Sequence, residues 1–323
     1  MPIDSDPDPP DGALEAPSAS GRGSPDGRAN AEARGNREAP GSREARDGSP
    51  AADFRQRQIA EHVRYQHVAD TAYRAYEARQ AWTDAVPKLR GTWEEHKEKY
   101  PERSHAAPRT QPDGSWVAEG GRRLTPQENA EAAKACADLR DEAGQVILPA
   151  MRRVEEASPD GRLAGLEHML KGEDRLKEKI AVATEVPGVT VREAVDLVPD
   201  AVRFTLTHNS ERYADGVLAD VDRLKAEGFE LIKLKNLWHA EQYKGINSQW
   251  RRPDTGLRFE MQFHTPESLE AKELTHEAYE RIRGQTLSST EKIELEGFQR
   301  RVNAQLAMPQ DINRIKDFPG AER

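Results

Sequence analysis

Three groups of polar residues in this sequence have the types and spacing that phosphate chemistry requires. In the first group, Lys171, Arg175 and Lys179 follow one another at intervals of four residues, so on a helix they would form one cationic ridge. Fixed positive charge of this kind can hold a polyphosphate. The alternative interpretation is a solvated helix face, because acidic residues alternate with these cations.

The second group is an acidic residue at the start of a predicted strand. Asp200 precedes Arg203 by three residues, and the segment 202–206 alternates between apolar and polar types. A carboxylate at a strand end suits Mg²⁺, which binds one or two carboxylates together with substrate phosphates. Taken alone, an Asp after Pro199 is typical of a turn.

The third group lies on one face of another predicted strand. Glu260, Gln262 and His264 occupy alternate positions, and the residues between them are apolar. Polar residues on a central strand cost desolvation free energy unless their face meets a cleft or solvent, so a site and a sheet with one solvated face are the two alternatives. Combined with the ridge and Asp200, this strand favours a site for a magnesium-bound nucleotide.

In the segments that would position these groups, the apolar residues repeat either at every second position or at helical spacing. Period-two alternation and apolar runs predict strands over residues 202–206, 229–237 and 257–265. An irregular polar stretch that contains Tyr243 and Asn247 separates the last two strands. Helical periodicity predicts helices over residues 128–156, 163–183, 210–228, 265–283 and 288–308. This order predicts an α+β fold, with a mixed sheet flanked by helices.

Residue types at the helix ends support these limits. Ser210 and Thr265 are predicted N-caps, and Ser288 begins a predicted capping box. Gly228 is the predicted C-terminal stop of the helix that Ser210 begins. Pro149 predicts a kink or a break within its helix.

The N-terminal third of the chain differs from the rest in composition. Residues 1–50 are rich in Pro, Gly, Ser and Ala and contain no aromatic residue, which predicts a disordered tail. An amphipathic helix is predicted from Asp53 to about Trp82, as part of a helical segment of residues 51–100. Its apolar residues are expected to pack on the domain or on a second copy, with docking of a partner as the alternative: Ile59, Val63, Tyr73 and Tyr76.

The remaining boundaries follow from turn-forming residues. Residues 101–126 predict a linker, with a small hairpin at Asp113-Gly114. Residues 127–285 form the predicted main domain, and residues 286–323 form a C-terminal helix and tail.

Composition excludes several classes of protein. The chain of 323 residues carries 57 acidic and 48 basic residues, a net charge of −9 that argues against unspecific wrapping of nucleic acid. Its apolar runs are too short for a membrane span, and its start lacks the basic and apolar regions of an ordinary secretory signal. One cysteine, Cys136, can form neither an intramolecular disulfide nor a thiolate metal cage. We therefore expect a cytoplasmic protein without a membrane partner, while delivery into a target cell by a specialised secretion system stays open.

Three motifs together resemble the RelA/SpoT-like alarmone synthetases. Residues 259–265, Phe-Glu-Met-Gln-Phe-His-Thr, and the later His276 resemble the family's Glu-x-Gln-x-Arg-Thr motif and trailing histidine. Lys171-x-x-x-Arg175-x-x-x-Lys179 resembles the ATP-binding helix, and residues 200–204 resemble the Asp-bearing first strand. The order of the motifs agrees as well, and the resemblance covers about residues 128–283.

This resemblance implies a nucleotidyltransferase-like fold that transfers pyrophosphate from ATP to a 3′-hydroxyl and releases AMP. It implies that Asp200 and Glu260 hold Mg²⁺, that Glu260 also helps to deprotonate the acceptor, and that Arg203 acts with them in catalysis. By the same resemblance, ATP would be bound by Lys171, Arg175 and Lys179. The acceptor would be bound by Tyr243, Asn247, Gln262, His264 and His276.

The sequence also departs from the family pattern. The family's Asp stands five residues before the strand arginine, whereas Asp200 stands three and Asp196 seven before Arg203, so which Asp would bind the metal stays open. The family's adenine-stacking arginine is Met169 here, and its guanine-stacking tyrosine is Ile246. The acceptor therefore stays open between a guanine nucleotide, an adenine nucleotide and the 3′ end of tRNA.

The absence of a His-Asp dipeptide indicates that the family's hydrolase domain is missing, which suits a toxin or a small stress synthetase. An antitoxin or immunity protein and a homo-oligomer stay open as partners. The main alternative function is a catalytically inactive nucleotide-sensing module on the same fold, followed by a structural helical protein. An ADP-ribosyltransferase is disfavoured because residues 288–290 and 294–296 are too close to occupy separate strands.

Overall fold

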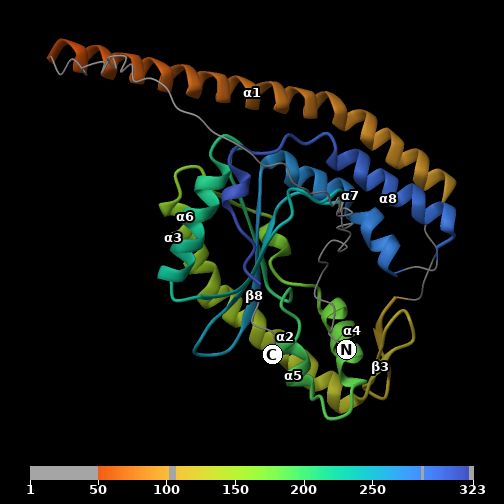
Figure 1. Ribbon diagram of the computed structural model, residues 1–323. Coiled ribbons are helices and arrows are strands. Elements are labelled where there is room, and N and C mark those ends of the chain that lie inside the picture. Colours follow the sequence, from red (N-terminus) through yellow and green to blue (C-terminus); the bar gives the residue numbers. More distant parts are fainter. Residues whose placement is uncertain (1–49, 102–106, 285–286, 320–323) are drawn as a thin grey trace, which may run out of the picture. The chain divides into compact units, whose positions relative to one another are not determined.

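The computed structural model describes residues 50–101, 107–284 and 287–319 (Figure 1). The described residues divide between two units, 50–71 and 72–319. The predicted disordered tail, residues 1–50, lies outside the described residues except for Pro50. In the described part of the chain, no helix has both the length and the apolar character needed to cross a membrane.

A mixed five-stranded sheet organises the larger unit and confirms the predicted α+β class (Figure 1). Its strands are β4 (Arg162–Ala164), β5 (Arg203–Thr207), β6 (Glu230–Asn236), β7 (Ile246–Arg251) and β8 (Arg258–His264). They lie in the order β4-β5-β8-β7-β6, and β5 and β8 are parallel while the other pairs are antiparallel. The strand β8, which carries the third polar group, is therefore central.

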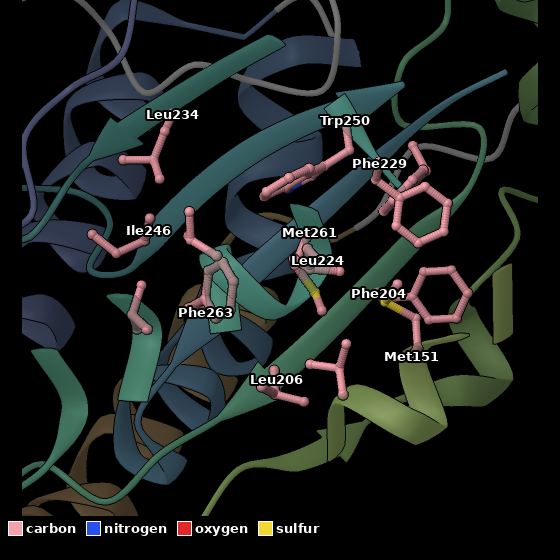
Figure 2. Close-up of a cluster of buried hydrophobic side chains, with 14 of the residues drawn as sticks. Met151, Phe204, Leu206, Leu224, Phe229, Leu234, Ile246, Trp250, Met261 and Phe263 are labelled. Carbon is pink, nitrogen blue, oxygen red and sulfur yellow. The ribbon is translucent and has the colours of Figure 1, made fainter. Parts of the chain in front are cut away.

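One face of this sheet forms the hydrophobic core (Figure 2). Phe259, Met261 and Phe263 alternate along β8 and are fully buried, as their spacing predicts. The helices α3 (Leu148–Ala157) and α6 (Tyr213–Ala226) cover this face. The other face carries the polar residues of β8, and α7 (Pro266–Gly284) contacts it.

A second apolar cluster joins three helices to a small three-stranded sheet. The helices are α2 (Pro126–Glu142), α4 (Glu173–Thr184) and α5 (Val191–Asp196), and the strands are β1 (Arg109–Thr110), β2 (Trp116–Val117) and β3 (Arg123–Leu124). The predicted linker is therefore a short antiparallel sheet rather than a single hairpin. Between α2 and α3, the π-helical segment η1 (Ala143–Ile147) makes the predicted break, and Pro149 lies in the first turn of α3.

The helix α1 (Pro50–Lys99) is longer than the helix predicted from Asp53 to Trp82. Trp82 and Trp93 are buried in a third cluster with α7 and α8 (Ser289–Asn303). Pro87 removes one helical hydrogen bond but does not end the helix, because this burial stabilises the turns on either side.

The apolar residues of α1 that were expected to pack are exposed instead. Ile59, Val63, Tyr73 and Tyr76 each retain more than half of their exposure. For Tyr73 and Tyr76, which belong to the larger unit, the predicted packing on the rest of the domain is wrong.

Several other predicted elements differ from the structure. The helix predicted over 163–183 is wrong in its first half, where β4 and the 3₁₀ helix η2 (Leu166–His168) precede α4. Gly165 has a left-handed φ of 62°, and β4 pairs with β5, so this segment cannot continue as a helix. Ser210 does not cap α6, which begins at Tyr213 after Arg212. The N-caps predicted at Thr265 and Ser288 are confirmed.

Candidate active site

The register of the sheet brings the predicted polar residues onto one face. Arg203 of β5 pairs with Glu260 of β8, which in turn pairs with Gln249 of β7. Gln262 lies in the next row on the same face and pairs with Asn247 of β7. Directly paired residues of neighbouring strands point to the same side of a sheet, so these side chains form adjacent rows on the polar face.

Asp200 is the most deeply buried charge of this face and is held by two lysines. Its Oδ2 lies 2.7 Å from Nζ of Lys171, and its Oδ1 lies 3.0 Å from Nζ of Lys179. Lys179 comes from α4, as predicted. Lys171 precedes that helix and is placed by its backbone N–H, which donates to the carbonyl oxygen of Ala201 at 3.0 Å. The ridge on one helix is therefore wrong, but both lysines reach the same carboxylate.

Arg203 joins Asp200 to the carboxylate on the central strand. Its Nη2 lies 3.5 Å from Oδ2 of Asp200, and its Nε donates to Oε2 of Glu260 at 2.9 Å. The chain of contacts continues along β8 and into α7. Gln262 donates to Oε1 of Glu260 at 2.7 Å, and Nζ of Lys272 donates to Oε1 of Gln262 at 2.6 Å.

We call this cluster the charged end of the polar face. Its members are Lys171, Lys179, Asp200, Arg203, Glu260, Gln262 and Lys272. The cations outnumber the two carboxylates, and the side chains of Lys171, Lys179 and Arg203 keep 15%, 17% and 20% of their exposure against 2% for Asp200. Cations that stay accessible above buried carboxylates can bind an incoming anion.

A second cluster on the same face is uncharged, and we call it the neutral end. His264 at the end of β8 contacts Tyr243 Oη through Nε2 and Ser268 Oγ through Nδ1, both at 2.9 Å. Tyr243 Oη also donates to Oδ1 of Asn247 at 2.7 Å. Burial, and next the charge of Lys272, hold the pKa of His264 well below its ordinary value, so the ring is neutral at pH 7.

Gly245 fixes the approach of the Tyr243 loop to this histidine. A Cβ at Gly245 would lie 2.8 Å from Cε1 of His264 and 3.1 Å from the carbonyl oxygen of Phe263. A side chain at this position would therefore push the loop away from β8.

Two predicted site residues lie apart from both clusters. The side chain of Arg175 is 64% exposed and pairs with Glu280 of α7 at 3.2 Å. His276 is exposed on α7, one turn beyond Lys272. Ser268 and Lys272 contact the two clusters, although the motifs do not indicate them. Their signal is the four-residue spacing Ser268, Lys272, His276, which puts them on one face of the helix that follows the Glu-x-Gln strand.

The donor set fits a magnesium ion only in combination with a substrate. In the part of the chain that the structure describes, no group of three or more His, Cys, Asp or Glu residues gathers as a metal site. Asp200 and Glu260 are two carboxylates linked by a single arginine, and Mg²⁺ completes its shell with substrate phosphates when a protein offers one or two carboxylates.

Comparisons with known proteins give similarity at the level of solved structures. No protein-family model and no curated protein matches the chain. Small alarmone synthetase 2 from Bacillus subtilis is 12% identical, with 54% of this chain and 91% of that chain covered and a TM-score of 0.36. A GTP pyrophosphokinase family protein from Streptococcus pneumoniae is 18% identical, with 54% and 84% covered and a TM-score of 0.34.

A third solved structure is small alarmone synthetase 1 from Bacillus subtilis bound to its product pppGpp. It is 13% identical to this chain, covers 54% of this chain and 88% of its own, and has a TM-score of 0.34. These solved structures come from the class of protein that the three sequence motifs resemble.

Proposed function

We propose that this protein transfers pyrophosphate from ATP to the 3′-hydroxyl of a nucleotide or of a tRNA 3′ end. The observation that carries the proposal is the charged end, where Arg203 links Asp200 to Glu260 and the lysines Lys171 and Lys179 stay partly exposed. A transferred phosphoryl group requires mainly positioning and neutralisation of charge, and this arrangement provides both.

Each residue of the charged end has a role in this proposal. Lys171, Lys179 and Arg203 bind the triphosphate and neutralise the charge that develops on it. Glu260 accepts the proton of the acceptor hydroxyl. Its two oxygens each accept one hydrogen bond in the structure, from Gln262 and Arg203, and a carboxylate oxygen can accept a second.

The reaction is a single displacement at the β-phosphorus of ATP. The 3′-oxygen of the acceptor forms a bond to that phosphorus, and the bond to the oxygen that bridges the α- and β-phosphorus atoms breaks. AMP leaves with the bridging oxygen, and the hydroxyl proton passes to Glu260. Asp200 and Glu260 would hold Mg²⁺, which when bound would offset the negative charge of the phosphates.

The neutral end is where we place the acceptor. It lies on the same sheet face as Glu260, one to two rows away along β7 and β8. Asn247 supplies an uncharged hydrogen-bonding group there, supported by Tyr243 and His264, and Gln262 of the charged end adds another. Such groups suit a nucleoside more than a polyphosphate. The product would accumulate in the absence of a hydrolase, which makes growth arrest on expression an expected effect of a toxin-like member.

The test is a labelled transfer reaction with the full chain. The protein is incubated with Mg²⁺ and β,γ-labelled ATP together with GDP, GTP, ADP, AMP or bulk tRNA, and label transfer and AMP release are followed by chromatography. We expect label on one acceptor class and an equal amount of AMP.

The matched control for this assay is Glu260→Gln, which keeps the shape of the side chain. We expect it to bind ATP and transfer no label. Binding of ATP by the unaltered protein without transfer to any acceptor would contradict the proposal and favour the inactive nucleotide-sensing module.

A further inference from the structure

A continuous chain of hydrogen bonds runs through the neutral end from α7 to β7. It begins at Ser268 Oγ, passes through Nδ1 and Nε2 of His264 at 2.9 Å on each side, and reaches Tyr243 Oη. From there it continues to Oδ1 of Asn247 at 2.7 Å. Each hydroxyl has one proton to donate and a neutral imidazole has one, so the whole chain can have one of two directions.

The surroundings of Ser268 decide the direction. Its hydroxyl can donate to Nδ1 of His264 at 2.9 Å or to the carbonyl oxygen of Thr265 at 3.2 Å. That carbonyl already accepts the helical hydrogen bond from the N–H of Leu269 at 2.9 Å. The shorter contact is therefore favoured, and Nδ1 accepts. The other end of the hydrogen-bond chain requires the same direction, because Oδ1 of Asn247 can only accept, so Tyr243 Oη donates to it and takes its own hydrogen bond from Nε2. The backbone of Lys244 acts against this direction, because it favours a protonated ring.

The position of His264 at the start of α7 favours the same direction. Its ring meets the first turn of this helix through Ser268, where the helix dipole produces a partial positive charge. A nitrogen lone pair facing that end is stabilised, and an added proton is not. His264 therefore carries its proton on Nε2 and donates it to Tyr243 Oη, which donates its own proton to Oδ1 of Asn247.

The consequence lies at Asn247. Its carbonyl oxygen is engaged by Tyr243, which turns its amide nitrogen to the other side of the group. Among the described residues, this nitrogen makes no hydrogen bond, and the residue is only partly buried on the polar face beside Gln262.

We propose that Ser268, His264 and Tyr243 are positioning residues that hold Asn247 with its amide donor toward the acceptor. The acceptor nucleotide then presents a hydrogen-bond-accepting atom, such as a base carbonyl oxygen, to β7. This inference rests on the proposed function for the identity of the bound molecule. The direction of the hydrogen bonds is a property of the protein alone and is tested separately.

The first test is the tautomer of His264 in the full chain. The protein is labelled with ¹⁵N-histidine, and the His264 signals at pH 7 are assigned by their loss in His264→Gln. We expect a neutral ring protonated on Nε2. Because Ser268→Ala removes the donor to Nδ1, we expect this second variant to shift the population toward the Nδ1-protonated form. A ring protonated on Nδ1 in the unaltered protein, or an imidazolium, overturns the inference.

The second test is a double-mutant cycle in the labelled transfer assay, with the acceptor that takes label. Loss of one neutral hydrogen bond should raise the acceptor KM of Tyr243→Phe about fivefold, with the ATP KM and kcat within about twofold of their starting values. If Tyr243 acts through Asn247, the acceptor KM of the double variant Tyr243→Phe, Asn247→Ala is no higher than that of Asn247→Ala alone. Tyr76→Phe, an exposed tyrosine on α1, is the matched control.

Asn247→Asp tests whether the side chain at position 247 donates a hydrogen bond to the acceptor nucleotide. A carboxylate only accepts hydrogen bonds at neutral pH, so we expect it to raise the acceptor KM further than Asn247→Ala does. Fully additive effects in the cycle, or an Asp variant that matches the native protein, overturn the inference. If no acceptor takes label at all, the proposed function fails and the acceptor part of this inference fails with it, while the spectrum still decides the direction of the chain.

Discussion

The charged end and the neutral end of the sheet face meet on one strand, where Glu260 and His264 are four residues apart on β8, yet they are stabilised by opposite means. At the charged end, buried carboxylates are neutralised by cations that stay partly exposed. At the neutral end, a fully buried ring loses its charge and is satisfied by uncharged donors and acceptors. The charged end therefore presents positive charge to an anion, while the neutral end fixes the direction of its hydrogen bonds.

Lys272 connects the two ends. Its Nζ donates to Gln262, which donates to Glu260, and its charge is the second cause, after burial, of the lowered pKa of His264. A cation that helps to hold the Glu260 carboxylate in place therefore also keeps the histidine neutral. Single substitutions at the two ends should have effects that differ in size and kind.

The largest effect is expected at Glu260. Glu260→Gln should reduce transfer at least about 100-fold, because it removes the proposed general base while it keeps the size of the side chain and one of its two accepting oxygens. The measurement is label transfer under saturating ATP, combined with an unfolding curve that shows the fold is intact.

Glu280→Gln is the matched control for this variant, because Glu280 also pairs with an arginine but lies outside both ends. It should retain transfer. Undiminished transfer by Glu260→Gln would mean that Glu260 is not the general base and that the charged end is not the site of transfer.

The next largest effect is expected at Lys171. Lys171→Ala removes one charge-assisted contact to a phosphate and should weaken ATP binding about tenfold, as measured by titration calorimetry. Lys177→Ala is the control, because Lys177 lies on α4 like Lys179 but pairs with Glu173. Equal ATP affinities of the two variants would mean that Lys171 does not bind ATP and only pairs with Asp200.

A third effect concerns stability and arises at the neutral end. The folded-state pKa of His264 lies below that of the unfolded chain, so as the pH falls through about 6.5 the unfolded state binds the proton first. The free energy of unfolding should therefore decrease with falling pH, by up to about 1.4 kcal/mol per pH unit from this group. At pH 7 and above the group should contribute no such loss.

The measurement is the unfolding free energy at several pH values between 7 and 5, for the native chain and for His264→Gln. The slope should be smaller in the variant. His96, whose pKa is also lowered by burial and by Arg281, leaves a residual slope in the same direction. A variant with the full native slope would show that His264 is not neutral in the folded state.

The sequence predicts the charged end better than the neutral end, and the reason is periodicity. Phe259, Met261 and Phe263 alternate so regularly that the strand and the orientation of Glu260 follow from them. Asp200 and Arg203 are likewise recognisable because they flank the start of a second alternating segment. Short-range patterns of this kind require no knowledge of tertiary contacts.

The neutral end depends on contacts that no short-range pattern records. The strand β7 is hidden because its core-facing residue Ser248 is polar, and its hydroxyl is satisfied by donating to the carbonyl oxygen of Met261 and accepting from Trp250.

The segment from Leu163 to Leu170 has helical spacing, yet pairing of β4 with β5 overrides it. The position of Lys171 beside Asp200 therefore follows from the backbone pairing of its segment next to β5.

The smallest effect is expected at Arg175, and it tests whether position or charge alone makes the charged end. Arg175 belongs to the same sequence motif as Lys171 and Lys179, but it is largely exposed and pairs with Glu280. Exposed pairs contribute little, so Arg175→Ala should change the unfolding free energy by less than about 1 kcal/mol and ATP affinity by less than about twofold. A loss as large as that of Lys171→Ala would mean that any cation near α4 serves the triphosphate. In that case, contact with Asp200 would not define the site, and the charged end would have to include Arg175.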